Sequence, residues 1–308
     1  MVEFLAACVV AGTPLVLATV GELITEKTGN LNLGVEGMML MGAVMGFYTG
    51  LHTASPLLAI LSAALAGAGG ALIYAFVTVT LKASQVVTGL TLTIFGTGFA
   101  QFVGEPLLGS MAPSEITAFF AKTTIPVLGQ IPFIGPIFFQ QDAFVYLSYM
   151  ICILAAVYMY KTKMGMNLKA LGENTGAADA SGININLYKY AHILTGGALC
   201  GLGGAYLSLV RIPIWQEDVV NGRGWIAVAL VIFVAWNPIK GFFGGVLFGG
   251  LSIIGLRFQA MGLGISQYLV DMIPYIATIL IVIISTHKKR KESQPPGDLG
   301  NNYFREER

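Results

Sequence analysis

The sequence carries little charge. Asp, Glu, Lys and Arg make up only 11% of its 308 residues, whereas 55% are hydrophobic and the mean hydropathy is +0.74. A soluble domain carries roughly 25% charged residues, and a chain this apolar could not cover its surface with polar groups. The formal net charge is +1, and the basic residues form no stripe outside the loops beside apolar runs, so we expect no nucleic-acid partner. The composition places the chain in a lipid bilayer.

Motifs for catalysis, nucleotide binding and metal binding are also missing. There is no G-x-x-x-x-G-K-[ST] phosphate loop, no H-E-x-x-H pair and no nucleophile elbow. The three cysteines, Cys8, Cys152 and Cys200, lie singly in apolar runs without metal-binding spacing, which excludes a disulfide framework and a zinc site. We therefore expect no enzymatic activity, no cofactor, no metal and no energy source within the chain itself.

The sequence does contain many apolar runs of a length that suits a membrane. A bilayer core of about 30 Å needs roughly 20 apolar residues per helix, and fewer where a helix is broken. The first run lacks a basic n-region and a cleavage site, so we expect it to remain as a helix. The seventh and eighth runs are short and are predicted to be half-helices or a tight hairpin. The candidate spans are 2–20, 34–50, 56–81, 86–103, 143–160, 191–210, 225–236, 241–256 and 265–286.

These runs predict an all-α fold, a polytopic transmembrane helix bundle of about 8–10 helices. Residues 1–286 form one membrane domain, and residues 287–308 form a polar tail with Pro295, Pro296 and Gly297 that is predicted to be disordered. Lysines are concentrated in the loop 161–190, and a basic run from Lys288 to Lys291 opens the tail, so both are predicted to be cytoplasmic. The acidic connection 104–142 is then external, and the N-terminus is external by count.

Small residues recur at helical spacing in two of the runs. Gly42, Gly46 and Gly50 form one stripe, and Gly241, Gly245 and Gly249 form another. Such stripes let the backbones of neighbouring helices approach closely in lipid. Each stripe follows a glycine-rich polar stretch, which hints at two structurally related halves.

The stretch "GELITEKTGNLNLGVEG", residues 21–37, places polar groups between two apolar runs. A carboxylate at the bilayer centre costs at least about 2.5 kcal/mol, so Glu22, Glu26 and Glu36 need an explanation if they lie deep. For Glu26 and the adjacent Lys27 we favour a solvated cytoplasmic loop. Glu36 falls in the first turn of the next helix, where the helix dipole and unpaired N–H groups favour a carboxylate. The segment therefore predicts a polar break that lines or gates a path through the bundle, with Asn30, Asn32 and Glu36 along it.

The loop "MGMNLKALGENTGAADASGININ", residues 164–186, is the second unusual segment. Its short apolar patterns, followed by Gly172 and Gly182, predict two small helices that lie flat at the cytoplasmic face. Connections this long are usually functional, so we expect it to dock onto a partner. The segment 211–225 is the third, and its Trp215 and Trp225 are predicted to be interfacial anchors.

The stretches "GELITEKTGNLNLGVEGMMLMGA", "LKALGENTGAADASGI" and "GRGWIAVALVIFVAW" resemble the permease subunits of bacterial ABC importers. The superfamily handles branched-chain amino acids, ribose and nucleosides, and the resemblance is greatest to the nucleoside branch with its basic-membrane-protein lipoproteins. It extends over most of residues 21–286. Gly176 departs from the family signature, which has Glu at that position.

The resemblance implies a bacterial inner-membrane permease that imports nucleosides with three partners: a separate ATPase, a second homologous permease and an external substrate-binding lipoprotein. It also implies that the loop around the "AADASG" stretch contains the helix that docks on the ATPase, through Gly172, Glu173, Ala177, Ala178 and Gly182. Two other classes remain open. One is an ion-coupled secondary transporter for a small polar solute, and the other is a membrane scaffold without a transport role.

Overall fold

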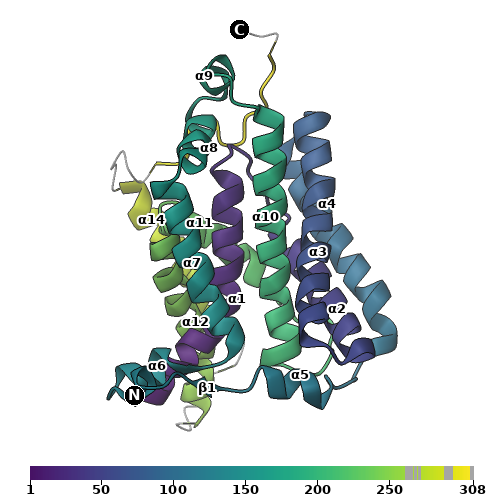
Figure 1. The fold of residues 1–308 in the computed structure, drawn as a ribbon, viewed down its shortest axis with the longest axis vertical. Coiled ribbons are helices and arrows are strands. Elements are labelled where there is room, and N and C mark those ends of the chain that lie inside the picture. The colour runs from purple at the N-terminus through teal and green to yellow at the C-terminus, as the bar shows by residue number, and fades with distance from the viewer. Residues whose placement is uncertain (261–265, 267–268, 270–271, 288–293, 306–308) are drawn as a thin grey trace.

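The helices form one upright bundle in the computed structural model, which describes residues 1–260, 266, 269, 272–287 and 294–305 (Figure 1). Its helices and strands are α1 Val2–Glu26, α2 Val35–Thr53, α3 Pro56–Ala75 with the π-helical turn η1 Phe76–Thr80, α4 Gln85–Gly104 with the 3₁₀ turn η2 Glu105–Leu107, α5 Ser114–Phe119, β1 Thr123–Thr124, the 3₁₀ turn η3 Leu128–Gln130, α6 Ile134–Phe138, β2 Gln140–Gln141, α7 Ala143–Lys161, α8 Lys163–Glu173, α9 Thr175–Ala180, α10 Ile185–Tyr206 with the π-helical turn η4 Leu207–Arg211, α11 Arg223–Phe233, α12 Pro238–Ala260 and α14 Ile273–His287. This confirms the predicted all-α fold, in which the only sheet of the described residues is the two-stranded β1–β2 pair.

The polar residues between the apolar runs begin the helices. At these N-caps a side-chain oxygen accepts a hydrogen bond from a backbone N–H of the first turn, which has no acceptor within its own helix. The caps are Ser55, Ser84, Asp142, Thr162, Asn174 and Asn184. These Ser, Thr, Asp and Asn residues therefore help to set where six of the helices start.

Five helical segments of the described residues are long and apolar enough to cross a membrane. They are Val2–Glu26, Pro56–Thr80, Gln85–Leu107, Ala143–Lys161 and Ile185–Arg211. The helix α11 has only 11 residues, as its short apolar run predicted. The first helix continues to Glu26, beyond the predicted end at Val20, and the start of the ninth predicted span, residues 265–272, lies mostly outside the described residues.

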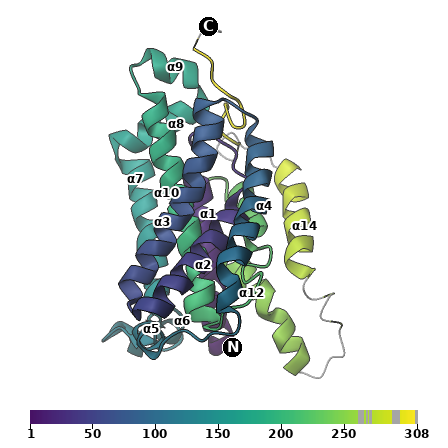
Figure 2. The same ribbon diagram turned by 90° about the vertical axis from the view of Figure 1, so that its right-hand side faces the viewer.

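The connecting segments lie at opposite ends of the bundle. The N-terminus, α5, α6 and β1 lie at one end, while α8, α9 and the end of the chain lie at the other (Figures 1 and 2). The loop 161–190 and the polar tail thus share one end, and the connection 104–142 occupies the other. This is the arrangement that the distribution of lysines predicted, although the predicted basic run 288–291 lies outside the described residues.

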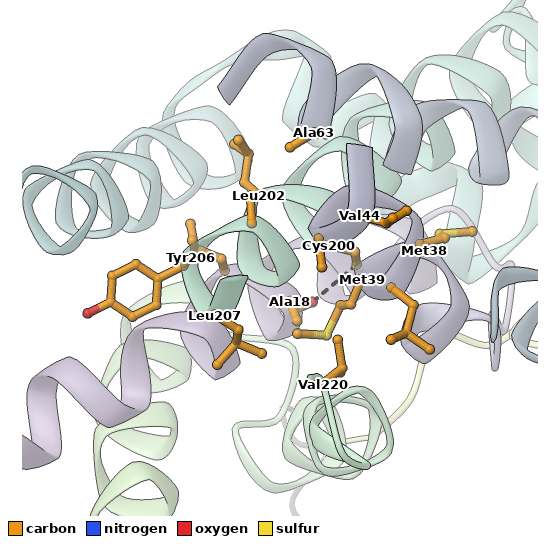
Figure 3. Packing of buried hydrophobic residues seen from close by; sticks show 14 of the residues in the cluster. Ala18, Met38, Met39, Val44, Ala63, Cys200, Leu202, Tyr206, Leu207 and Val220 are labelled. Carbon is orange, nitrogen blue, oxygen red and sulfur yellow. Dashed lines mark hydrogen bonds between the residues drawn. The ribbon is translucent and has the colours of Figure 1, made fainter. Parts of the chain in front are cut away.

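Two buried helices, α1 and α10, run through the middle of the bundle and contact each other along their lengths. The helix α1 packs along α12, and α10 packs along α3. The main apolar cluster draws most of its residues from α2, α3 and α10, and in it the Cys200 thiol is 3.9 Å from the carbonyl oxygen of Ala18 in α1 (Figure 3). The glycine stripes lie on α2 and α12, and the two related halves that they hinted at stay a prediction.

The glycine stripes allow close approaches between helices. A Cβ at Gly42 in α2 would overlap the backbone of Gly201 in α10. We expect Gly42→Ala to lower the free energy of unfolding by about 3 kcal/mol, because a backbone atom cannot move aside as a side chain can. Gly69 in α3 has no atom within 4 Å of its Cβ position, so Gly69→Ala is the matched control. Thermal unfolding of both purified variants checks this, and equal melting temperatures would contradict the close packing.

The polar tail is ordered over residues 294–305, where the sequence predicted disorder. The N–H of Asp298 donates to the carbonyl oxygen of Gly172 (2.9 Å), and the N–H of Gly300 donates to that of Gly29 (3.0 Å). The Tyr303 hydroxyl donates to the Asp179 carboxylate (2.8 Å), which also pairs with Arg305 (3.1 Å). The prediction of disorder was wrong because composition does not show that backbone groups of the loops form hydrogen bonds with the tail.

Candidate functional site

Two helix breaks bring polar groups into the interior. The first, which we call the break segment, is residues 27–34 between α1 and α2, and the second is residues 212–222 before α11. With 11 residues at about 1.5 Å each, α11 spans roughly 16 Å, about half of a bilayer core. The helix α11 contacts both α1 and α2. Each break is followed by a helix whose first turn lies inside the bundle.

The two first turns meet at the Glu36 side chain. Its carboxylate accepts hydrogen bonds from the backbone N–H groups of Gly222 (2.8 Å) and Gly224 (2.6 Å) at the start of α11. Gly222 caps α11 with a φ of +76°, and Arg223 follows it. Helix N-termini favour a carboxylate because their first N–H groups have no partner within the helix. We call Glu36, Gly222 and Gly224 the half-helix junction, and it joins α2 to α11 by charge-assisted hydrogen bonds.

The Glu22 carboxylate of α1 binds the break segment through hydrogen bonds. Glu22 accepts from the backbone N–H of Asn32 (3.1 Å) and from its side-chain amide (3.2 Å). The Asn32 amide oxygen accepts from the N–H of Gly34 (2.9 Å), and the Thr28 hydroxyl lies 3.2 Å from the Asn30 amide oxygen. All of these side chains are buried, so each polar group depends on a partner within the chain.

Helices α3 and α4 satisfy three further backbone groups of the break segment. The Tyr74 hydroxyl donates to the Leu31 carbonyl oxygen (2.7 Å), and the Leu31 N–H donates to the Gln85 side chain (2.7 Å). The Thr93 hydroxyl donates to the Leu33 carbonyl oxygen (3.0 Å). Sequence analysis missed Tyr74, Gln85 and Thr93. Tyr74 and Thr93 lie in apolar runs and Gln85 lies in the connection between two runs, and none of the three gives a local sign of its partner.

Glu26 corrects a sequence-based expectation. It was placed in a solvated loop, but it lies in the last turn of α1 with 1% of its surface exposed. Its carboxylate accepts a hydrogen bond from the indole N–H of Trp236 (2.6 Å). The Lys27 ammonium lies 5.7 Å from the Trp236 ring centre. Burial lowers the pKa of Lys27, and the Glu173 carboxylate opposes that shift. The end of α1 is thus fastened to the segment after α11.

The predicted docking residues lie on α8, on α9 and in the turn after α9, at one end of the bundle, but they divide into two groups. Glu173, Ala177 and Gly182 are exposed, whereas Gly172 and Ala178 are buried. Ala178 packs in an apolar cluster with Leu171 and Ile185. The exposed group is available to a partner chain, and the buried group holds α8 and α9 to the bundle.

Gly172 connects the docking segment to the break segment. A Cβ at Gly172 would overlap the carbonyl oxygen of Lys27, the first residue of the break segment. The carbonyl oxygen of Gly172 also accepts a hydrogen bond from the N–H of Asp298 in the tail. Two residues further along the tail, the N–H of Gly300 donates to the carbonyl oxygen of Gly29 in the break segment. The end of α8 and the break segment are therefore in direct contact.

The exposed side of helix α4 is mainly apolar, with a few small or polar residues among large side chains. Ile94 (75% exposed) and Phe102 (81% exposed) lie on the same side of the helix as Thr91, Gly98 and Gln101. The opposite side, with Gly89, Leu92 and Gly96, is buried. The exposed side suits lipid or a partner chain, and Thr91 and Gln101 can form hydrogen bonds there.

The structure brings some of the predicted path residues together. Asn30 and Asn32 belong to one hydrogen-bonded network with Thr28 and Glu22, whereas Glu36 belongs to the half-helix junction. All three side chains are at least 95% buried, with 1%, 1% and 5% exposed. The prediction that they line a substrate path stays a prediction, since their polar atoms are engaged inside the chain.

Comparisons with known proteins show the family of the chain. A family model described as "Branched-chain amino acid transport system / permease component" matches residues 4–282. The chain is 35% identical to "Putative glucose ABC transporter permease protein TsgC13" of Haloferax volcanii, with 97% of each chain covered. It is 34% identical to the guanosine ABC transporter permease protein NupQ of Bacillus subtilis, with 89% of each covered. It is 33% identical to the nucleoside ABC transporter permease protein NupC of Lactococcus lactis, with 88% of each covered. No solved structure matches the chain.

Proposed function

The chain belongs to the family of branched-chain amino acid transport system permease components and is a multi-pass membrane permease of the ABC type, and we propose that it serves an importer of nucleosides. The observation that carries the choice of substrate is the similarity, over most of the chain, to two permeases named for guanosine and for nucleosides. In this proposal the chain supplies the membrane path, and the work is done by a separate ATPase.

The substrate proposal has one rival with an observation behind it. The relative with 35% identity and 97% coverage is named for glucose. Uptake of radiolabelled guanosine, glucose and leucine by the reconstituted complex separates the two. We expect guanosine to accumulate with ATP and unlabelled nucleosides to compete with it. Accumulation of glucose with no competition from nucleosides would overturn the nucleoside proposal and leave the permease role intact.

The exposed face of α8 and α9 is the proposed contact with the ATPase. Glu173, Ala177 and Gly182 are exposed there. The small size of Ala177 and Gly182 suits insertion into a groove, and Glu173 offers a carboxylate beside them. The contact of Gly172 with Lys27 offers a direct mechanical link from this face to the break segment. Movement of the break segment would then act on the half-helix junction, where two helices meet end to end and tilt relative to each other.

The exposed face of α4 is the proposed lining of the substrate path, shared with a second, homologous permease chain. Thr91 and Gln101 supply hydroxyl and amide groups that can hydrogen-bond a polar solute or water, and Gly98 leaves space between them. In this proposal the second permease covers the apolar residues Ile94 and Phe102 of the same face, and the path runs between the two chains. An external substrate-binding lipoprotein would deliver the solute at the end that carries α5 and α6.

We further propose that α8, α9 and the C-terminal tail face the cytoplasm of a bacterial cell. The three native cysteines are buried, and a cysteine-free background gives clean labelling. In that background we expect Gly182→Cys to react with a membrane-impermeant maleimide only after cells are opened. Lys122→Cys, exposed at the other end, is expected to react in intact cells. The reverse pattern would contradict the orientation and, with it, docking of a cytoplasmic ATPase on α9.

A further inference from the structure

A polar cavity of about 530 Å³ lies at the end of the bundle that carries α9. Its walls come from three places: η1 and the residues after it, the turn from α9 into α10, and the ordered tail. Three of its lining residues are cationic, Lys82, Lys189 and Arg305, and one is acidic, Asp179. Gly182 also belongs to the docking face proposed for the ATPase, but that proposal gives the rest of the cavity no role.

Lys189 is the unusual member of this lining. Its side chain is 95% buried, with 5% of its surface exposed, and it lies one turn into α10. In the described part of the chain, no hydrogen bond or ion pair is formed by its ammonium group, and the Asp298 carboxylate attracts it from beyond salt-bridge distance. A buried ammonium without a close partner is costly, so the cavity it lines has a strong preference for an anion.

The other cations of the cavity are already engaged. The Lys82 ammonium lies 4.4 Å from the ring centre of Phe304, and Arg305 pairs with Asp179 at 3.1 Å. Both contacts involve the tail, so the tail completes the cavity. An anion held by Lys189 would meet these two cations at the rim without requiring either to leave its partner.

The start of α10 contributes a second set of donors. Asn184, Ile185 and Asn186 line the cavity. The Asn184 side chain already accepts from the N–H of Leu187, which leaves the N–H groups of Ile185 and Asn186 at the start of the helix for a ligand. An ammonium one turn into the helix, above these N–H groups, is an arrangement that suits a phosphate group, which accepts several charge-assisted hydrogen bonds at once. The cavity is much larger than one carboxylate requires, and its Thr80, Asn184 and Asn186 side chains can bond further oxygens.

We propose that this cavity binds a phosphate group, held by Lys189 and the start of α10. It lies where the spanning segments Pro56–Thr80 and Ile185–Arg211 end, which is the level of lipid headgroups. Leu81 and Leu187, next to lining residues, are 61% and 63% exposed and suit acyl chains. The phosphate comes either from an anionic phospholipid, which is abundant in such leaflets, or from a soluble phosphate compound.

The test uses the full-length chain, stripped of lipid, and measures its melting temperature with each probe. Phosphatidylglycerol, phosphatidylcholine and inorganic phosphate are added separately to the wild type, to Lys189→Met and to Lys163→Met. Lys163 is an exposed cation of α8 outside the cavity, so its variant removes the same charge as a matched control. Native mass spectrometry gives the affinity of each bound probe.

We expect phosphatidylglycerol to stabilise the wild type and Lys163→Met, and Lys189→Met to bind it roughly ten- to hundred-fold more weakly. In phosphatidylcholine alone, Lys189→Met is expected to melt no lower than the wild type, because it removes an unpaired buried charge. If that variant fails to fold, Arg305→Gln on the exposed tail is expected to show a smaller loss of binding.

The two sources give different results. Stabilisation by phosphatidylglycerol but not by inorganic phosphate identifies a lipid site. Stabilisation by inorganic phosphate that depends on Lys189 and competes with the lipid identifies a soluble ligand, and supports the same phosphate site. If neither probe binds the wild type more tightly than Lys189→Met and Arg305→Gln, the proposal is overturned.

Discussion

An Ala177→Trp permease is expected to insert and fold normally but to lose ATP-driven uptake by more than about ten-fold. A ten-fold loss corresponds to a contact with the ATPase that is weakened by about 1.4 kcal/mol. Ala177 is exposed on α9, where its methyl group leaves room for a partner surface. An indole at this position would hold the ATPase away from α9 without touching the core of the bundle. Uptake by reconstituted complexes, together with co-purification of the ATPase, measures the effect.

Lys240→Trp is the matched control for added bulk. Lys240 is exposed at the start of α12, near Trp236 and therefore at the same end of the bundle as α9. We expect this variant to transport at the wild-type rate. Normal uptake by Ala177→Trp would remove α9 from the coupling contact, and loss of uptake in both variants would show that the ATPase covers more of this end than we propose.

Glu36→Ala is expected to lower the free energy of unfolding by roughly 3–5 kcal/mol, the cost of removing one partner from a buried charged contact. The substitution leaves the N–H groups of Gly222 and Gly224 without their acceptor in the interior. It also unlinks α2 from α11. Melting of the purified chain checks this, and a fall on the order of 10 °C corresponds to such a loss.

Two other variants separate the contact from the charge. Glu36→Gln keeps one oxygen acceptor and is expected to lose about half as much stability. Glu115→Ala removes an exposed carboxylate from α5 and is expected to leave the melting temperature unchanged. A Glu36→Ala chain as stable as the Glu115→Ala chain would show that the half-helix junction contributes little.

Local sequence patterns predicted the features that depend on neighbouring residues in the chain. Polar residues inside an apolar region marked the break segment, and the lengths of the apolar runs marked most of the helices. The position of Glu36 in a first helical turn predicted that N–H groups would stabilise it, although not that they belong to α11. The glycine spacing of α2 predicted a close neighbour without identifying α10.

Long-range contacts were beyond the reach of these patterns. Glu26 looked solvated because the chain turns polar after it, yet its partner Trp236 is 210 residues away. Trp215 was predicted to be an interfacial anchor, but it is buried and packs against Phe47 with ring centres 5.6 Å apart. The tail looked disordered because its own residues are polar, and its order depends on backbone groups of Gly29 and Gly172. In each case the contacting residues are far apart in the sequence, and no local pattern identifies the partner.

The most direct test of the account is uptake of labelled guanosine into proteoliposomes that contain the permease chain with and without its ATPase. We predict that guanosine accumulates only when the ATPase, the second permease, the binding protein and ATP are all present, and that an ion gradient alone drives none. Accumulation by the isolated chain under an ion gradient would contradict the account and favour a secondary transporter.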